Sequence, residues 1–88
     1  MMFAYILKAS IAPNEQTEEF FRRFTQTPGL LRAYDLQSVD DSNESAVVAI
    51  WQSREAAERY LAEAPLRKEV DAAVPAVTRT MYNVRGSK

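Results

Sequence analysis

The apolar run at residues 46–51, AVVAIW, most constrains how this 88-residue chain can fold. A strand with one wet face alternates apolar and polar side chains, whereas a strand covered on both faces is apolar at successive positions. Residues 2–11, MFAYILKASI, are nearly as apolar and are rich in strand-forming residues. The sequence therefore predicts a sheet in which two strands are covered on both faces.

The rest of the N-terminal half predicts one helix and one more strand. Asn14 is a good N-cap for a helix over residues 15–27, in which glutamates lie early and arginines late, as the helix dipole favours. Phenylalanines form an apolar stripe on this helix, which ends at Pro28-Gly29. Residues 30–39 resemble a half-exposed strand, and the turn DDSNE joins them to residues 45–51 as a hairpin.

The C-terminal half predicts a second helical region and a last strand. Ser53 is the expected N-cap, and small apolar residues recur at helical spacing as far as Ala64. Pro65 suits the first position of a further helical piece, which Pro75 closes, and residues 77–84 form a strand. The order β-α-β-β-α-β over residues 1–88 predicts a single α+β domain, ferredoxin-like, with an antiparallel sheet.

Two helices can cover only one face of such a sheet, so the other face of the apolar strands must be covered by something else. At roughly 25 cal/mol per Å² of buried apolar surface, covering a patch of several hundred Å² contributes on the order of 10 kcal/mol. A second copy of the chain, packed sheet to sheet, is the simplest cover. We therefore predict a homodimer, which also suits a short chain without cysteines to staple its core.

Charge and residue types exclude several classes of function. The eleven basic and twelve acidic residues are interleaved, so we expect no basic face for nucleic acid. Histidine and cysteine are absent, which removes Ser–His and Cys–His nucleophiles and the usual metal ligands. The start of the chain, MMFAYILKASIAP, lacks the charged region of a signal peptide and is too short to span a membrane. We expect a cytoplasmic protein without a metal site.

Three segments, TPGLLRAYDL, VVAIWQSREAAERYLAEAPLRKEV and RTMYNV, resemble the antibiotic biosynthesis monooxygenase domain, and the resemblance covers essentially the whole chain. Members of that family carry a Pro-Gly before the second strand. They also carry a tryptophan at the end of the third strand, followed by a small polar cap and a helix that starts with Glu-Ala. The resemblance implies a dimeric α/β-barrel with a pocket between helices and sheet in each subunit.

The resemblance also implies a reaction. Some members oxygenate aromatic quinols without metal or flavin, so a cofactor-independent monooxygenase acting on a planar, quinol-like molecule is one expectation, with no cofactor. Haem-degrading members carry asparagine, tryptophan and histidine where this chain has Leu7, Tyr60 and Val70, so haem degradation is not expected. The alternatives are a non-catalytic small-ligand-binding or stress-related protein of the same fold, and a dimer whose pocket is filled by its own side chains.

Candidates for the pocket come from both sheet and helices: Trp51, Tyr60, Leu7, Phe24, Tyr5 and Arg79. Trp51 either stacks on a planar ligand or fills the core where the third strand meets the next helix. Tyr60 either binds a substrate oxygen or is a core residue whose hydroxyl needs a partner. Arg79 could neutralise an enolate, but an edge position or a salt bridge to Asp35 is the favoured interpretation. No residue is assigned as the proton acceptor.

Overall fold

The computed structural model describes residues 2–88, and its elements follow the order β1–α1–β2–β3–α2–α3–β4. The strands are β1 (Phe3–Ala9), β2 (Leu30–Gln37), β3 (Ser45–Trp51) and β4 (Thr78–Asn83). The helices are α1 (Glu15–Phe24), α2 (Arg54–Glu63) and α3 (Pro65–Ala73). The predicted α+β class and ferredoxin-like order are confirmed, with β2 ending before the expected boundary at residue 39.

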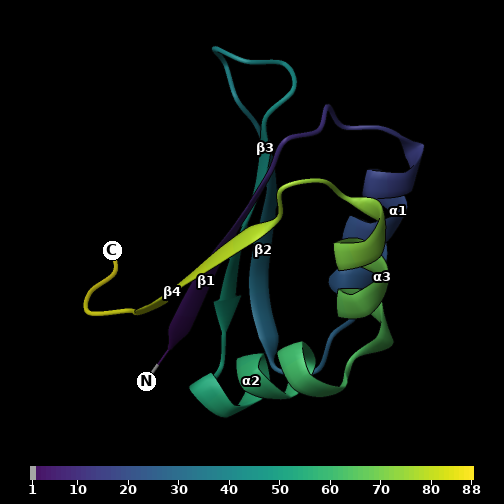
Figure 1. The fold of residues 1–88 in the computed structure, drawn as a ribbon. Coiled ribbons are helices and arrows are strands. Elements are labelled where there is room, and N and C mark those ends of the chain that lie inside the picture. The colour runs from purple at the N-terminus through teal and green to yellow at the C-terminus, as the bar shows by residue number, and fades with distance from the viewer. Residues whose placement is uncertain (1) are drawn as a thin grey trace.

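The four strands form one antiparallel sheet in the order β2-β3-β1-β4. In its centre Phe3 lies opposite Trp51, and Tyr5 lies opposite Ala49. Because directly opposed residues in an antiparallel pair share a face, these four side chains point to the same side of the sheet. Figure 1 shows α1 and α3 side by side against this side, with α2 across the lower end. None of the helices within residues 2–88 is long and apolar enough to cross a membrane.

Local hydrogen bonds fix where the helices begin. The Asn14 Oδ1 atom accepts a hydrogen bond from the Thr17 backbone N at 2.9 Å, and the Asn14 backbone N donates to Thr17 Oγ1 at 2.8 Å. This reciprocal capping box satisfies amides that the first turn of α1 leaves free. At α2, Ser53 Oγ accepts from the Ala56 backbone N at 3.2 Å, and α3 begins with Pro65. Both predicted N-caps are confirmed.

The turn from α1 into β2 requires glycine. Gly29 has a φ of +85°, a conformation that L side chains rarely adopt. A Cβ atom at this position would lie 2.5 Å from the Ala56 Cβ in the first turn of α2. Gly29 therefore lets α2 pack closely against the start of β2, at the end of the sheet where Trp51 lies.

The face of the sheet opposite the helices is also apolar. Ala4 and Ile6 of β1 and Val48 and Ile50 of β3 are half-buried there, without a helix from residues 2–88 against them. Large exposed side chains on the flanking strands extend this face: Tyr34, Leu36 and Tyr82. The two central strands are thus apolar on both faces, as the sequence predicted, and one of these faces lies open in the single chain.

Candidate ligand-binding site

Four aromatic side chains fill the helix–sheet interface near the end of β3: Tyr5, Phe24, Trp51 and Tyr60. In all five ring contacts among them the ring centroids lie between 5.2 and 5.9 Å apart. Trp51 is 0% exposed, and its Nε1 atom has no hydrogen-bond partner among residues 2–88. The ring of Trp51 is therefore surrounded by the chain's own side chains and belongs to the core of this region.

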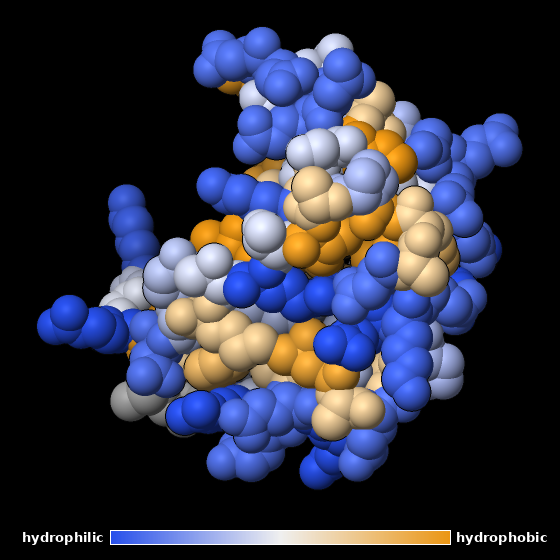
Figure 2. All heavy atoms as spheres, in the orientation of Figure 1, coloured by the Kyte–Doolittle hydropathy of each residue, from blue (hydrophilic) through white to orange (hydrophobic). Residues whose placement is uncertain are grey.

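A cavity of about 70 Å³ continues the same interface toward the start of β3. Phe20 and Phe21 of α1 form one wall, and Leu66 and Val70 of α3 form another. The sheet contributes small or medium side chains: Leu7, Ala9, Ser45, Ala46 and Val47. Because these side chains are shorter than the rings around Trp51, they leave a space between the helices and the sheet here. Figure 2 shows apolar side chains gathered in the middle of this view in two groups, with a band of hydrophilic side chains between them and further hydrophilic ones around them.

Two phenols lie along the inner part of the cavity, where Tyr5 and Tyr60 line it. Burial raises the pKa of the Tyr5 hydroxyl well above its usual range, and burial likewise raises the pKa of Tyr60. Both phenols therefore stay protonated at neutral pH. In that state each can donate a hydrogen bond to a ligand oxygen, and neither acts as a ready proton acceptor.

The outer part of the cavity is more polar, because Thr17, Asp35 and Ser45 line it. Partial burial raises the pKa of the Asp35 carboxyl, and the negative charge of Glu18 on α1 raises it further. Thr17 is engaged in the capping box of α1. The site thus has an apolar middle, donors at its inner end and a carboxylate at its mouth.

Arg79 lies on the edge strand β4, as predicted, but its partner is not Asp35. Its Nη1 atom lies 2.8 Å from Asp71 Oδ1 on α3, while its Nε and Nη2 atoms are buried without a partner within residues 2–88. The predicted salt bridge to Asp35 is wrong because β2 and β4 are opposite edges of the sheet. The guanidinium group instead joins the sheet to α3 beside the cavity.

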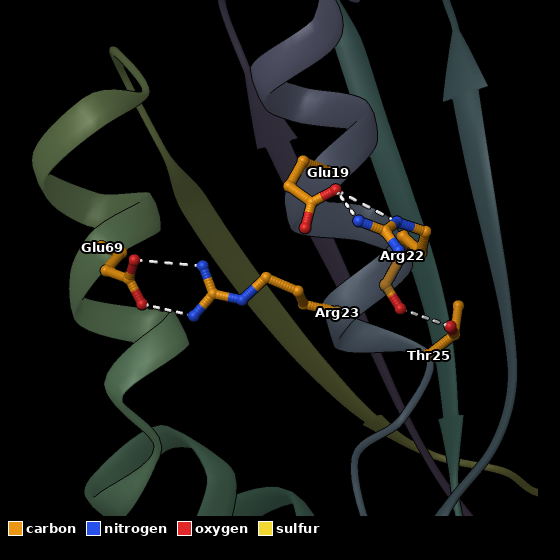
Figure 3. Close-up of polar contacts among 5 residues, drawn as sticks. All are labelled: Glu19, Arg22, Arg23, Thr25 and Glu69. Atoms are coloured by element: carbon orange, nitrogen blue, oxygen red, sulfur yellow. Dashed lines mark hydrogen bonds and ion pairs between the residues drawn. The ribbon is translucent and has the colours of Figure 1, made fainter.

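An exposed ion pair links the two helices that cover the cavity. Arg23 of α1 donates two hydrogen bonds to the Glu69 carboxylate of α3, at 3.0 and 2.6 Å (Figure 3). On α1 itself, Arg22 pairs with Glu19 and its carbonyl accepts from Thr25 Oγ1. The Arg23–Glu69 contact lies on the outer surface, so it holds the helices together without entering the cavity.

Of the six candidates from the sequence, four line this cavity: Tyr5, Leu7, Phe24 and Tyr60. Trp51 and Arg79 are not among the residues that line it. Sequence reasoning did not identify Asp35 as a cavity residue. The predicted hairpin could have indicated it, because Asp35 lies opposite Val47 there. Sequence reasoning also missed the contribution of α3, from which Leu66 and Val70 line the cavity. Within the described chain, no group of three or more acidic side chains is placed to hold a metal ion.

No protein-family model matches the sequence, and no curated protein sequence matches it. Solved structures do match over nearly the whole chain. A variant of SnoaB, a cofactor-independent oxygenase from Streptomyces nogalater, aligns with a TM-score of 0.78 and 20% identity over 98% of this chain and 95% of that one. The fold is that of the antibiotic biosynthesis monooxygenases. A protein of that name aligns with a TM-score of 0.75 and 16% identity, over 96% of this chain and 99% of its own.

The Mycobacterium tuberculosis protein Rv0793 shares the fold as well, with a TM-score of 0.79 and 15% identity over 99% of this chain and 98% of its own. The fold that the sequence resemblance implied is therefore confirmed for the single chain, and the dimer that it implied stays a prediction. The TM-scores of 0.78 and 0.79 show a common fold at identities of only 15 to 20%. A fold does not determine function, which depends on the residues of the site.

Proposed function

We propose that this protein is a cofactor-independent monooxygenase that acts on a planar, hydroxylated aromatic molecule of the quinol type, bound in the cavity between the helices and the sheet. The observation that carries the proposal is an apolar cavity of about 70 Å³ with two buried, protonated phenols at its inner end. The shared fold with the cofactor-independent oxygenase SnoaB supports the reaction class.

The apolar and aromatic walls of the cavity suit a flat aromatic ring. Because about 10–15 Å³ of such space is enough for one water molecule, a volume of about 70 Å³ admits a group of several atoms. Phe20, Phe21 and Phe24 offer ring faces and edges, and aromatic pairs gain roughly 0.5–1.5 kcal/mol beyond the burial of their area. A planar apolar ligand with few polar atoms fits this lining.

In the proposed reaction the substrate supplies the electrons that reduce dioxygen. One oxygen atom is added to a ring carbon, which becomes a carbonyl, and the other leaves as water with two hydrogens from the substrate. The chain binds the ring, excludes water, and donates hydrogen bonds from Tyr5 and Tyr60 to the substrate oxygen on which negative charge develops. Their raised pKa values suit this role, since a donor must keep its proton.

Oxygen uptake with hydroxyanthracenes in the presence of a chelator tests the proposal. We expect dioxygen consumption above the rate in buffer, and one atom of isotope-labelled dioxygen in each molecule of product. Tyr60→Phe should lower kcat about tenfold, as the loss of one hydrogen bond in the transition state would. Ser42→Ala is the control, because it removes a hydroxyl from the exposed hairpin turn, outside both the cavity and the open face of the sheet. Product without label from dioxygen would overturn the proposal.

The alternative is a small-ligand-binding protein without turnover. It is favoured by one observation, which is that the inner end of the cavity holds phenols with raised pKa values and no carboxylate to accept a proton. Saturable binding of hydroxyanthracenes without oxygen uptake would establish this second function and exclude the first.

We further propose that two copies pack sheet to sheet through the open face. Ile6, Val48 and Ile50 form its centre, and Tyr34 and Tyr82 stand at about half exposure on either side. Equilibrium sedimentation at micromolar concentration should give a dimer that Val48→Glu dissociates. Val39→Glu is the control, since Val39 is 98% exposed at the hairpin and lies outside this face. A wild-type protein that sediments only as a monomer would contradict the proposed dimer.

A further inference from the structure

We propose that Asp35 selects the ligand of this cavity: its carboxylate accepts a hydrogen bond from a hydroxyl group on the outer edge of the ligand, and it repels ligands that carry a negative charge there. The inference rests on the proposed function, since it takes the cavity as the substrate site. It adds which end of the substrate faces the mouth and which chemical groups are accepted at that end.

The backbone places Asp35 on the cavity side of the sheet. On β2 it lies directly opposite Val47 of β3, and both residues line the cavity together with Ser45. Tyr5 and Phe24, at the inner end, are buried, whereas Asp35 is an exposed residue. A ligand that fills the apolar middle would therefore meet Asp35 at the mouth.

The carboxylate of Asp35 has unused hydrogen-bonding capacity. Its side chain makes no ion pair or hydrogen bond with residues 2–88, unlike the carboxylates of Glu69 and Asp71, which each pair with an arginine. An ionised carboxylate can accept several hydrogen bonds, and a partly buried one loses part of its contact with water. A ligand hydroxyl placed at the mouth would supply a donor that the chain does not.

The charged group that acts on Asp35, Glu18, is negative. From α1 the facing charge is Glu18, and from β3 the facing residues are Val47 and Ser45, which carry no charge. A carboxylate or sulfonate on the outer edge of a ligand would lie near two like charges, and like charges set against each other weaken binding. A hydroxyl group there avoids this repulsion and gains a charge-assisted hydrogen bond.

This arrangement gives the two oxygens of a quinol different surroundings. The inner oxygen meets the protonated phenols of Tyr5 and Tyr60, which suit a developing negative charge. The outer oxygen meets Asp35, which suits a hydroxyl that keeps its proton. Asp35 is therefore a specificity-determining residue that fixes the direction in which the ring enters.

Binding in the absence of oxygen tests this selection with three probes: naphthol, naphthalene and naphthalenesulfonate. Trp51 reports binding by fluorescence, because its ring lies 5.7 Å from those of Tyr5 and Tyr60 in the cavity wall. We expect the wild-type protein to prefer naphthol over naphthalenesulfonate by at least about tenfold. Asp35→Asn should reduce this preference about tenfold, whereas Asp40→Asn, which removes the same charge from the exposed hairpin turn, should leave it unchanged.

The pH dependence gives a second readout. Naphthalenesulfonate stays ionised as the pH falls, so protonation of Asp35 removes part of the repulsion. The affinity of the wild-type protein for naphthalenesulfonate should therefore increase as the pH is lowered through the raised pKa of Asp35. In Asp35→Asn this increase should be smaller, because the charge of Asp35 is then absent at every pH.

Equal preference in wild-type protein and Asp35→Asn would overturn the inference, and so would the failure of every naphthalene to bind. The proposed oxygenase is tested separately. If the wild-type protein takes up oxygen but Asp35→Asn keeps the wild-type ligand preference, the proposed oxygenase stands and the role of Asp35 is refuted. The predicted preference without any oxygen uptake would support the role of Asp35 and refute the enzyme.

Discussion

The two ends of the interface between the helices and the sheet are built on the same strands. One end is filled by side chains, and the other contains a cavity. Around Trp51, the rings of Tyr5, Phe24 and Tyr60 pack against the indole and leave it no exposed surface. Around Val47, on the same face of β3, shorter side chains leave a cavity of about 70 Å³. Side-chain size along one strand face therefore decides where this fold is closed and where it is open. The first region should govern stability, and the second should govern ligand binding.

Removing the tryptophan should have the largest effect. Trp51→Ala deletes a side chain that is fully buried among Tyr5, Phe24 and Tyr60, so we expect the free energy of unfolding to fall by about 3–5 kcal/mol. Urea denaturation measures this change, with Val39→Ala at the exposed hairpin as the control. A loss below about 1 kcal/mol would mean that the region around Trp51 is not the closed end of the interface.

Filling the cavity should have the opposite pattern. Val47→Phe places a ring in the space of the ligand, so we expect naphthol affinity to fall about tenfold or more, which corresponds to about 1.4 kcal/mol. Because the added atoms enter an existing void, the free energy of unfolding should change by less than about 1.5 kcal/mol. Titration calorimetry and urea denaturation report the two quantities, and Val39→Phe is the control. Unchanged naphthol affinity would place the ligand elsewhere.

Tyr5 belongs to both regions, and its burial should appear as a pH effect on stability. In the unfolded chain a tyrosine ionises near pH 10, whereas in the folded chain burial raises the pKa of Tyr5. Above about pH 10 the unfolded state therefore loses a proton that the folded state keeps. The free energy of unfolding should then fall by up to about 1.4 kcal/mol per pH unit for this group.

Tyr5→Phe should make that decrease shallower, and Ser42→Ala, which removes a hydroxyl from the exposed hairpin turn, should not. Urea denaturation between pH 9 and 11 measures both variants. Identical slopes in wild-type protein and Tyr5→Phe would show that the Tyr5 hydroxyl is not held in a buried environment.

The smallest effect is expected from the ion pair that joins α1 and α3 outside the cavity (Figure 3). Arg23 and Glu69 are both exposed, and water and salt screen such pairs strongly. Glu69→Gln should therefore leave naphthol affinity unchanged and alter the urea midpoint only slightly, in a way that disappears at high salt. A marked loss of naphthol affinity would show that the spacing of the two helices controls the cavity.

Much of the fold followed from local patterns in the sequence. The caps at Asn14 and Ser53 and the Pro28-Gly29 turn each act within a few residues, so their effects could be predicted from the chain itself. The apolar runs at residues 2–11 and 46–51 predicted two strands that are apolar on both faces, and the sheet order places these strands, β1 and β3, in the centre.

The site was harder to predict, because it depends on which residues meet across elements. Whether Trp51 closes the interface or lines a pocket depends on the rings of Phe24 and Tyr60, which come from two different helices. The roles of Asp35 and Arg79 depend on sheet order and register, which set them at opposite edges. The spacing of residues in the sequence gives a list of aromatic and charged candidates. Only the strand register shows which of them lie inside the cavity, at its mouth or in the core.

The most direct test of the division between the two regions is to locate bound naphthol by nuclear Overhauser effects in solution. We expect contacts between the ring protons of naphthol and the methyl groups of Val47, Leu66 and Val70, which line the cavity. Contacts with the methyl groups of Ile6, Val48 or Ile50 instead would place the ligand on the opposite face of the sheet. That result would contradict the cavity as the binding site and, with it, the proposed function.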